Sequence, residues 1–316
     1  MRTIVMTGAT AGLGLEAARV LSQDPNIDLI IGARRPDNTP ALDAAVPSDR
    51  RTMIALDTSD EGSVNAFCAD VRARLAGRAI DGLALNAGAQ LSGAGAAPTA
   101  RADANAAEFD TTFATNFLGH VRIVQHLRDL LSTDARVVVT ASQSHKPGDR
   151  ITRLLGYRGA IWTGAAGVAR GIGDPAATPA QHARDRYATS KLCCIVWVFA
   201  EAQRAEKRRA ADGERATVSP IFIAYDPGAV PGTEIARDLS LVKRFGWRRP
   251  LRRIAPLLPG FSTPARSGAT LARLLSDPAC ARFAGDYVDY QLRPAILWDA
   301  ARRVDWQAEL MTLVEG

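Results

Sequence analysis

Residues 3–14 read TIVMTGATAGLG, and this stretch decides the fold that the sequence predicts. Thr3–Thr7 is a short apolar run, and glycines follow it at positions 8, 12 and 14. Such glycines let the backbone turn sharply and let a pyrophosphate approach it, while the helix that starts near Leu13 points free N–H groups at the anion. The stretch therefore predicts a strand, a nucleotide-binding turn and a helix, although its G-x-x-x-G-x-G spacing differs from the G-x-G-x-x-G fingerprint.

The rest of the chain repeats this alternation of short apolar runs and longer amphipathic segments. Several runs, such as DLIIGA and RVVVT, are apolar almost throughout, which favours a parallel sheet covered by helices on both faces. The predicted strands are Thr3–Thr7, Asp28–Ala33, Thr52–Leu56, Gly82–Leu85, Arg136–Thr140, Val218–Ala224 and Tyr287–Tyr290. The predicted helices are Leu13–Leu21, Glu61–Leu75, Ala107–Leu131, Ala188–Lys207, Pro264–Leu275 and Leu297–Leu313. We expect one doubly wound α/β domain of the Rossmann type over residues 1–316, with substrate-side insertions at 146–186 and 227–263.

Composition narrows the class of protein. The chain has 316 residues, 47% hydrophobic and 23% charged, which is enough to bury a globular core. No run approaches the roughly 18 apolar residues of a membrane span, and the N-terminal stretch lacks the apolar segment of a signal peptide. The cysteines have neither metal-ligand spacing nor the pattern of a disulfide framework, so we expect buried thiols, no metal and a reducing, cytoplasmic environment. They are Cys68, Cys193, Cys194 and Cys280.

The net charge of +6 is concentrated in two segments, Lys243–Arg253 and Arg204–Arg209. A basic patch can attract nucleic acid or anionic lipid. No nucleic-acid motif accompanies this charge, so we interpret it as solvated surface and expect no nucleic-acid partner. Apolar residues beside the arginines of Lys243–Pro259 leave peripheral membrane contact as the weaker alternative.

The end of the second predicted strand indicates which dinucleotide binds. A carboxylate at this point favours NAD, because it accepts a hydrogen bond from the ribose 2′-OH, whereas a cation favours the 2′-phosphate of NADP. The sequence places Arg34 and Arg35 there, and a guanidinium can pair bidentately with phosphate. We therefore predict NADP(H), with Arg34 as the main contact and two surface arginines as the alternative. After the third strand, Asp57 and Thr58 either contact the adenine edge, or Asp57 caps the next helix.

A phenol and an ammonium follow at Tyr187 and Lys191, within RYATSKLCC. Residues at i and i+4 share one helix face. An ammonium beside a phenol, together with an oxidised nicotinamide ring, favours the phenolate and lowers its pKa, so that the phenol can exchange a proton with a substrate oxygen. The pair predicts an acid–base centre, although a lone Y-x-x-x-K also occurs on ordinary helix surfaces.

These features occur together in the short-chain dehydrogenase/reductases, which the sequence resembles over nearly its whole length. The motifs follow the family's order: the glycine loop, Asn86-Ala87-Gly88, Asn116 in TNFLGH, Ser142 in TASQSH, Tyr187-x-x-x-Lys191, and Pro227-Gly228. The resemblance implies that Tyr187 is the acid–base residue and that Lys191, Ser142 and Asn116 complete a catalytic tetrad. Ser144 is the alternative to Ser142, because strand alternation places both on one face.

The resemblance and the residue patterns together give a set of expected dinucleotide contacts. These are Thr7, Gly8, Thr10, Ala11, Gly12, Leu13, Gly14, Arg34, Arg35, Asp57, Thr58, Asn86, Ala87, Gly88, Tyr187, Lys191, Pro227, Gly228, Val230 and Thr233.

The 45 positions from Ser142 to Tyr187 are more than in the simplest members of the family. This long interval, the SKLCC run and the place of Thr233 after Pro227 resemble the branch that includes protochlorophyllide reductases and retinol dehydrogenases. The light-dependent members carry a cysteine directly after the Pro-Gly, where this sequence has Ala229. We therefore expect a dark, NADPH-dependent carbonyl reduction or its reverse. Reduction of a conjugated C=C bond is the alternative, and a non-catalytic NADP-binding sensor is a weaker one.

Aromatic residues in the two insertions suggest a bulky, apolar or aromatic small-molecule substrate, although they fit loop packing equally well. They are Tyr157, Trp162, Phe245 and Trp247. The apolar face of the Tyr187 helix is either core or the contact of a homodimer, and the C-terminal Trp298 and Trp306 favour a monomer if they cover it. The residues of this face are Ile195, Val196, Val198 and Phe199.

Overall fold

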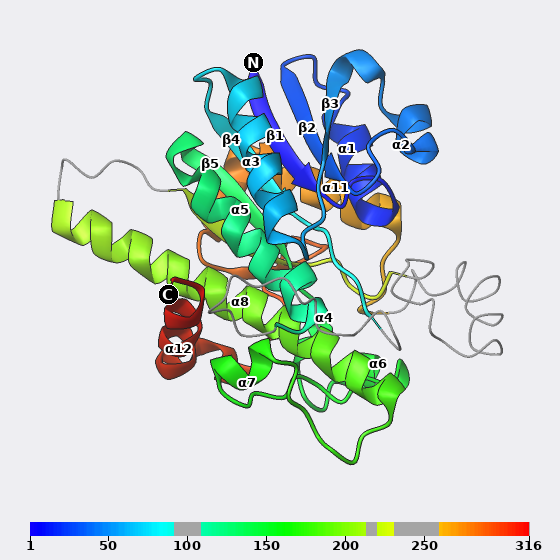
Figure 1. The fold of residues 1–316 in the computed structure, drawn as a ribbon, viewed down its shortest axis with the longest axis vertical. Coiled ribbons are helices and arrows are strands. Elements are labelled where there is room, and N and C mark those ends of the chain that lie inside the picture. The colour runs from blue at the N-terminus through cyan, green and yellow to red at the C-terminus, as the bar shows by residue number, and fades with distance from the viewer. Residues whose placement is uncertain (92–108, 213–219, 231–258, 316) are drawn as a thin grey trace.

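The computed structural model describes residues 1–91, 109–212, 220–230 and 259–315, and a single parallel sheet forms its centre (Figure 1). The strand order is β3-β2-β1-β4-β5-β6-β7, and every neighbouring pair is parallel. The strands are β1 (Arg2–Thr7), β2 (Ile27–Ala33), β3 (Arg51–Ala55), β4 (Ile80–Leu85), β5 (Leu131–Thr140), β6 (Ile221–Asp226) and β7 (Tyr287–Asp289). The order reverses between β1 and β4, and doubly wound folds bind ligands at the carboxyl ends of the strands at such a point.

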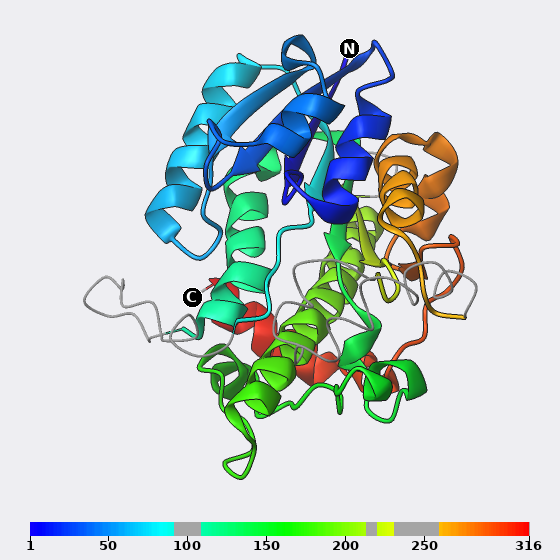
Figure 2. The same cartoon turned by 90° about the vertical axis from the view of Figure 1, so that its right-hand side faces the viewer.

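Helices cover both faces of this sheet (Figure 2). On one face, α1 (Gly12–Leu21) packs against α11 (Pro264–Ser276), and on the other lie α3 (Glu61–Leu75), α5 (Gly119–Leu127) and α8 (Pro179–Asp212). Side chains of successive residues alternate between the two faces, so Ile4 and Met6 belong to the α1/α11 core, while Val5 belongs to the other. The predicted doubly wound fold is therefore confirmed, and each predicted strand has a counterpart in the sheet.

Short elements connect these layers. They are α2 (Pro40–Ala45), α4 (Thr111–Phe113), α6 (Arg150–Leu154), α7 (Ala165–Ala169), α12 (Val304–Glu315), the π-helical turn η3 (Ala114–Leu118), and the 3₁₀ turns η1 (Ser48–Arg50), η4 (Arg128–Leu130), η5 (Gln143–His145), η9 (Pro278–Phe283) and η10 (Asp299–Arg302).

Three predicted helices differ from the observed ones. The predicted helix 107–131 is interrupted by the π-helical turn η3, and Leu131 already belongs to β5. The predicted helix 297–313 begins only at Val304, after a 3₁₀ turn. Helix α8 begins earlier than predicted, at Pro179, a residue whose fixed φ and missing N–H suit the first turn of a helix.

A tight contact holds α5 against the loop after β3. A Cβ on Gly119, the first residue of α5, would lie 2.0 Å from the carbonyl oxygen of Thr58. No larger side chain fits this position without moving the loop, so Gly119 fixes how closely α5 approaches β3.

The C-terminal helix α12 packs across α8 and α7 (Figure 1). Trp306 stacks on Trp162 of the first insertion at 4.6 Å between ring centroids, and Glu309 accepts a hydrogen bond of 3.1 Å from the backbone N–H of Ala165. The chain therefore buries the apolar face of α8 itself, which consists of Ile195, Val196, Val198 and Phe199. All four cysteines are unpaired and buried, as predicted.

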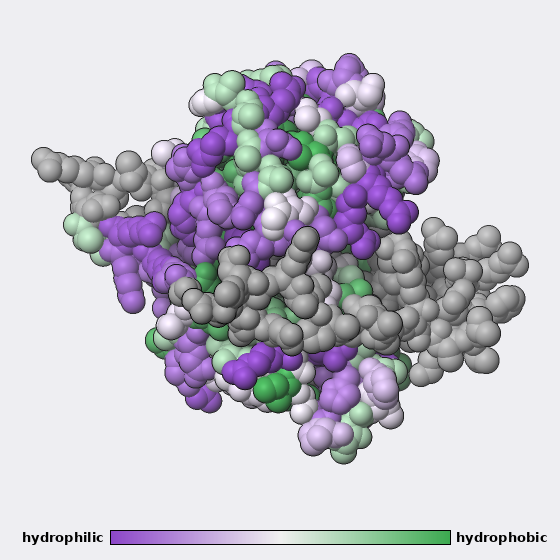
Figure 3. Space-filling model, in the orientation of Figure 1, coloured by the Kyte–Doolittle hydropathy of each residue, from purple (hydrophilic) through white to green (hydrophobic). Residues whose placement is uncertain are grey.

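Hydrophilic side chains dominate the described part of the surface drawn in Figure 3, with apolar side chains appearing between them. Among the described residues, no helix combines the length and the apolar character that a bilayer span requires. The basic segment Lys243–Pro259, with Phe245 and Trp247, lies outside the described residues except for its last residue.

Candidate active site

The glycine turn between β1 and α1 has the conformation that its sequence predicted. Gly8 and Gly12 have φ values of +67° and +59°, in the region that favours glycine. A Cβ on Gly14 would lie 2.2 Å from the carbonyl oxygen of Gly8, so this position also requires glycine. The residue before α1, Ala11, has no side chain that caps the helix, and the first turn has no acidic residue. The backbone N–H groups after Thr10, among them that of Leu13, therefore have no capping side chain and suit an anionic ligand.

Side chains at the ends of β1, β4 and β5 hold this turn in place. The hydroxyl oxygen of Thr7 accepts hydrogen bonds of 3.0 Å from the backbone N–H groups of both Asn86 and Ala87. The amide of Asn86 donates to the carbonyl oxygen of Gly8 at 2.9 Å and accepts from the Thr140 hydroxyl at 3.0 Å. Thr7 and Asn86 therefore shape the turn.

The two arginines after β2 are exposed. Neither Arg34 nor Arg35 forms an ion pair with any residue in the described part of the chain. Both arginines follow the carboxyl end of β2, which is parallel to its neighbour β1. The glycine turn follows the carboxyl end of β1, so the arginines and the turn lie at the same end of the sheet. The position fits a phosphate on the ribose next to the pyrophosphate.

Asp57 and Thr58 have mainly structural contacts. The Asp57 carboxylate accepts hydrogen bonds from the backbone N–H and the hydroxyl of Ser59, at 2.9 and 2.7 Å. Asp60, not Asp57, caps α3, through a hydrogen bond of 2.7 Å from the N–H of Ser63. The capping alternative for Asp57 is therefore wrong, and Thr58 is buried against Gly119.

Tyr187 and Lys191 lie together on α8 and both are buried, with 5% and 3% of their surface exposed. The Lys191 ammonium nitrogen lies 5.8 Å from the centroid of the Tyr187 ring. It donates a hydrogen bond of 2.7 Å to the carbonyl oxygen of Thr140 at the end of β5. A Cβ on the exposed Gly88 would lie 3.3 Å from this nitrogen, so the ammonium also borders the turn after β4.

Burial raises the pKa of the Tyr187 phenol well above its ordinary value, and the nearby Tyr157 adds to this rise. A hydrogen bond with Ser142 acts in the opposite direction but is the smaller effect. Burial also lowers the pKa of Lys191. The net shift of the Tyr187 pKa in the folded chain is therefore upward, because removal of the phenol from water outweighs the hydrogen bond with Ser142. That Lys191 and an oxidised nicotinamide ring together lower this pKa stays a prediction.

Ser142 is the serine that faces Tyr187. Its hydroxyl oxygen accepts a hydrogen bond of 3.2 Å from the backbone N–H of Ser144, which leaves its own proton available for another acceptor. Ser144 is buried, and its hydroxyl has no hydrogen-bond partner among the described residues. Of the two alternatives, the geometry favours Ser142.

Asn116 lies in the π-helical turn η3 and is fully buried. Its side-chain amide accepts from the N–H of Ala89 at 2.8 Å and donates to the carbonyl oxygen of Ala89 at 2.9 Å and to the hydroxyl of Ser190 at 3.0 Å. The residue thus joins the turn after β4 to α8. π-Helical turns are frequent at functional sites, and no sequence pattern revealed this one.

The Pro227-Gly228 turn follows β6. Gly228 has a φ of +73°, and a Cβ there would lie 2.8 Å from the Tyr290 ring. Its N–H donates a hydrogen bond of 3.0 Å to the carboxylate of Asp226. Val230 is the last described residue of this segment, and Thr233 lies outside the described residues.

The first insertion contributes Tyr157 to this site. Its hydroxyl donates a hydrogen bond of 2.5 Å to Oε1 of Gln90, just after the Asn86-Ala87-Gly88 turn. Its ring lies 5.9 Å from the ring of Tyr187. Sequence reasoning identified Tyr157 but missed Gln90 and Asp226. The position of Asp226 at the carboxyl end of a buried strand, next to Pro-Gly, was a usable signal, whereas Gln90 had none.

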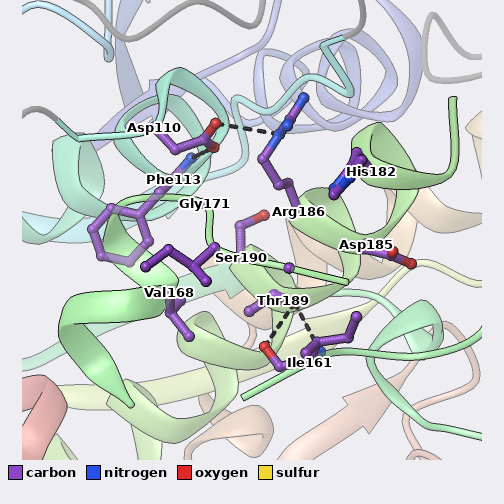
Figure 4. Close-up of a pocket in the computed structure, with 12 residues that line it drawn as sticks. Asp110, Phe113, Ile161, Val168, Gly171, His182, Asp185, Arg186, Thr189 and Ser190 are labelled. Atoms are coloured by element: carbon purple, nitrogen blue, oxygen red, sulfur yellow. Dashed lines mark hydrogen bonds and ion pairs between the residues drawn. The ribbon is translucent and has the colours of Figure 1, made fainter. Parts of the chain in front are cut away.

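A separate pocket lies beside the N-terminal half of α8 (Figure 4). Its lining includes His182 and the ion pair between Arg186 and Asp110, whose atoms are 3.2 Å apart. None of the residues expected to bind the dinucleotide or to take part in catalysis lines it. We therefore place the candidate active site at the strand ends, not in this pocket.

Comparison with known proteins supports the resemblance that the sequence motifs indicated. The family model for short chain dehydrogenases matches residues 2–151. A chloroplastic protochlorophyllide reductase of Chlamydomonas reinhardtii is 27% identical over 293 residues, which are 88% of this chain and 67% of that protein. A polyprenol dehydrogenase of Mus musculus is 27% identical over 294 residues, 91% of this chain and 75% of that protein.

The chain is similar to the short-chain dehydrogenase/reductases, whose family model matches a little under half of its 316 residues. Its relatives confirm the predicted resemblance to the protochlorophyllide reductase branch. A crystal structure of NADPH-bound carbonyl reductase from chicken fatty liver has the same fold, with a TM-score of 0.58 and 17% identity over 94% of this chain and 99% of that chain. These similarities support an oxidoreductase that uses a nicotinamide cofactor.

Proposed function

We propose that this short-chain dehydrogenase/reductase is a single NADP-binding domain that reduces the carbonyl group of a bulky apolar or aromatic small molecule, or oxidises the corresponding alcohol. The observation that carries the proposal is the buried Tyr187 phenol, which faces Ser142 and lies one helical turn from Lys191. A proton donor and a second hydroxyl at one point suit a substrate oxygen that gains negative charge.

The residues at the strand ends fit a phosphorylated dinucleotide. The uncapped first turn of α1 would hold the pyrophosphate, and Arg34 would bind the 2′-phosphate, with Arg35 beside it. The exposed Gly88 and the Pro227-Gly228 turn would border the nicotinamide. When bound, NADPH supplies the hydride. NADPH in the carbonyl reductase of the same fold supports this choice.

The chain's own residues would manage the proton. Tyr187 donates its proton to the substrate oxygen, and the Ser142 hydroxyl donates a hydrogen bond to the same oxygen. Lys191, anchored to the Thr140 carbonyl, keeps a positive charge near the phenolate that forms and so limits the cost of the transfer. Asn116 fixes the turn after β4 against α8, which keeps Lys191 and Gly88 in register.

The proposed substrate class rests on Tyr157. Tyr157 lies in the first insertion, and its ring borders the ring of Tyr187. A substituent next to the reacting carbonyl would therefore contact an aromatic surface. Protochlorophyllide reductases among the relatives favour reduction of a conjugated C=C bond as the second candidate. Ala229 stands where those enzymes carry a cysteine, so a proton for carbon would have to come from another group.

NADPH consumption with 2-acetonaphthone and with a matching conjugated enone tests the proposal. The naphthyl alcohol is the expected product, and a saturated ketone from the enone would favour the second candidate. Tyr187→Phe should lower turnover by about 10²- to 10⁴-fold, the usual contribution of a general acid, while NADPH binding stays nearly unchanged. Tyr225→Phe is the matched control, because that buried phenol donates to the Ser267 carbonyl instead. Equal turnover of the wild type and Tyr187→Phe would refute the assignment.

A further inference from the structure

One fully buried histidine links the turn of Ser142 to the C-terminal segment of the chain. His145 ends the 3₁₀ turn η5, which Ser142 caps, and its side chain lies entirely within the protein. Its Nδ1 lies 2.7 Å from the carbonyl oxygen of Ser142. Its Nε2 accepts a hydrogen bond of 3.2 Å from the backbone N–H of Trp298, 153 positions further along the chain. Each ring nitrogen therefore has a partner, and the second partner comes from a distant part of the fold.

These two contacts fix which ring nitrogen carries the proton. A backbone N–H can only donate, so the Nε2 that faces Trp298 is the unprotonated nitrogen. A neutral imidazole has one N–H, which then lies on Nδ1 and donates to the Ser142 carbonyl oxygen. Burial lowers the His145 pKa to about 4, which keeps the ring neutral near pH 7. The same oxygen also accepts from the backbone N–H of His145 at 3.3 Å, so the ring supplies its shorter contact.

The ring takes its orientation from segments outside its own turn. The Tyr287 ring of β7 lies nearly perpendicular to it, at 5.4 Å between ring centroids. The backbone N–H of Ala160, in the first insertion, donates a hydrogen bond of 3.0 Å to the His145 carbonyl oxygen. Trp298 in turn contacts the Trp306 ring of α12, 5.4 Å from its own. The direction of the Nδ1–H group is therefore set by three parts of the fold rather than by the local sequence.

We propose that His145 is a positioning residue, whose ring, held by the Trp298 N–H, fixes the peptide plane after Ser142 and so directs the Ser142 hydroxyl at the substrate oxygen. The inference rests on the proposed function for its catalytic consequence, but the link from Trp298 to His145 is a property of the folded chain. The hydroxyl and the carbonyl of Ser142 are joined through one Cα, so a change in that peptide plane displaces the hydroxyl. A displaced donor stabilises the developing negative charge less well. His145 touches no reacting atom and acts only through Ser142.

Two amide side chains separate the two contacts of the ring. The amide nitrogen of His145→Asn can take the place of Nδ1 and donate to the Ser142 carbonyl oxygen, but this side chain is too short to accept from Trp298. The amide oxygen of His145→Gln can take the place of Nε2 and accept from Trp298, but no group then donates in place of Nδ1. Both variants replace a buried ring, so both should lower the melting temperature. A purely structural histidine would show only this loss.

Amide hydrogen exchange tests the link without any turnover. In His145→Asn, the Trp298 N–H should exchange at least about tenfold faster than in the wild type, because it loses its acceptor. In His145→Gln, it should exchange within about threefold of the wild-type rate. Wild-type exchange of this amide in His145→Asn would overturn the link. If neither variant folds, the ring ¹⁵N chemical shifts of the wild type decide the question. A protonated Nδ1 and an unprotonated Nε2 are expected, and the opposite tautomer would overturn the link.

Kinetics test the positioning role, and here the order of the two variants reverses. With 2-acetonaphthone and NADPH, His145→Gln should lower kcat by about ten- to hundredfold, the cost of a small misplacement, whereas His145→Asn should stay within about fivefold of the wild type. KM for NADPH should change less than about threefold in both, because the uncapped end of α1 and Arg34 lie elsewhere. His182→Gln, in the separate pocket, is the matched control and should keep the wild-type kcat.

Equal kcat values in the two His145 variants would overturn the positioning role, because the proposal assigns the effect on Ser142 to Nδ1 alone. A wild type that reduces no carbonyl or enone would instead overturn the proposed function, and the exchange measurement would still decide the link between Trp298 and His145.

Discussion

The phenol of Tyr157 donates a hydrogen bond to Oε1 of Gln90, and this contact joins the first insertion to the loop after β4. It fixes the Tyr157 ring 5.9 Å from the ring of Tyr187. A substrate that presents its oxygen to Tyr187 therefore meets a wall whose position depends on Gln90. The wall belongs to the segment between Ser142 and Tyr187, the first predicted insertion.

Changes at Tyr157 should alter the choice of substrate more than the rate of chemistry. Tyr157→Phe keeps the ring but loses one hydrogen bond, so kcat/KM for 2-acetonaphthone should fall about two- to tenfold, matching about 0.5–1.5 kcal/mol. Tyr157→Ala also removes the aromatic surface and should cost about tenfold or more with this ketone. Steady-state kinetics with 2-acetonaphthone and with acetone give the ratio of the two kcat/KM values for each variant. Equal losses with both ketones would argue against a role in specificity.

Replacement of Arg34 should separate the two dinucleotides. A charge-assisted hydrogen bond to phosphate contributes about 1.5–3 kcal/mol, so Arg34→Ala should weaken NADPH binding by about ten- to hundredfold. NADH lacks the 2′-phosphate, so its affinity should stay nearly constant. Arg35→Ala, at the neighbouring exposed arginine, should have the smaller effect. Titration calorimetry with both dinucleotides checks this, and a parallel loss of NADH binding would exclude Arg34 as the phosphate contact.

The fold should lose stability in acid partly through His145. Its Nδ1 is 2.7 Å from the Ser142 carbonyl oxygen, and its Nε2 accepts a hydrogen bond of 3.2 Å from the N–H of Trp298, so the neutral ring satisfies both contacts. Burial lowers the His145 pKa to about 4 and the His120 pKa to about 3, below the ordinary 6.5. The unfolded chain thus binds protons first, and the stability that these rings contribute is complete above pH 6.5 and is lost as the pH falls toward 4.

His145→Asn should flatten this dependence. The loss of unfolding free energy between pH 7.5 and 5 should be smaller in the variant by about 1–2 kcal/mol, the part of the linkage that falls in this range. The difference between variant and wild type is the informative quantity, because Asp226, with its raised pKa, acts in the opposite direction. Urea unfolding at several pH values measures it. A constant difference across the range would show that His145 does not titrate with unfolding.

Gly119 should tolerate no side chain. Gly119→Ala places a methyl group 2.0 Å from the Thr58 carbonyl oxygen, so the contact between α5 and the loop after β3 must open. Overpacking of this kind costs about 1–3 kcal/mol. Gly62→Ala is the control, since its nearest atom is the Asp60 carboxylate at 3.2 Å in an exposed first helical turn. Thermal unfolding compares the two, and an equal change in melting temperature would contradict the close approach.

The sequence predicted much of the fold, because a strand that is buried on both faces consists almost entirely of apolar residues and can be recognised as a short apolar run. Strands such as β2 and β5 are nearly continuous apolar runs, and their boundaries differ from the predicted ones by only a few residues except at the start of β5. The catalytic candidates were equally accessible, since each lies in a short motif beside a strand or on α8. The sequence did not predict the helix boundaries near 111–131 and 297–304. A π-helical turn and a 3₁₀ turn lie there, and such turns depend on packing rather than on hydrophobic periodicity.

The parts of the site that sequence did not predict arise between distant residues. Gln90 and Tyr157 are 67 positions apart, and nothing in either local sequence indicates the partner. The direction of the Tyr187 pKa shift depends on how completely the folded chain removes the phenol from water, a quantity that i, i+4 spacing does not contain.

The hydrogen bond from Trp298 to His145 spans 153 positions of the chain. A nascent polypeptide that has left the ribosome only as far as β6 already holds every residue of the proposed tetrad, yet it lacks Trp298, the partner that fixes the His145 ring next to Ser142. Contacts of such long separation form late, after loop closure over much of the domain. During synthesis, competence for chemistry should consequently arise in one late step, when Trp298 reaches His145, rather than grow with chain length.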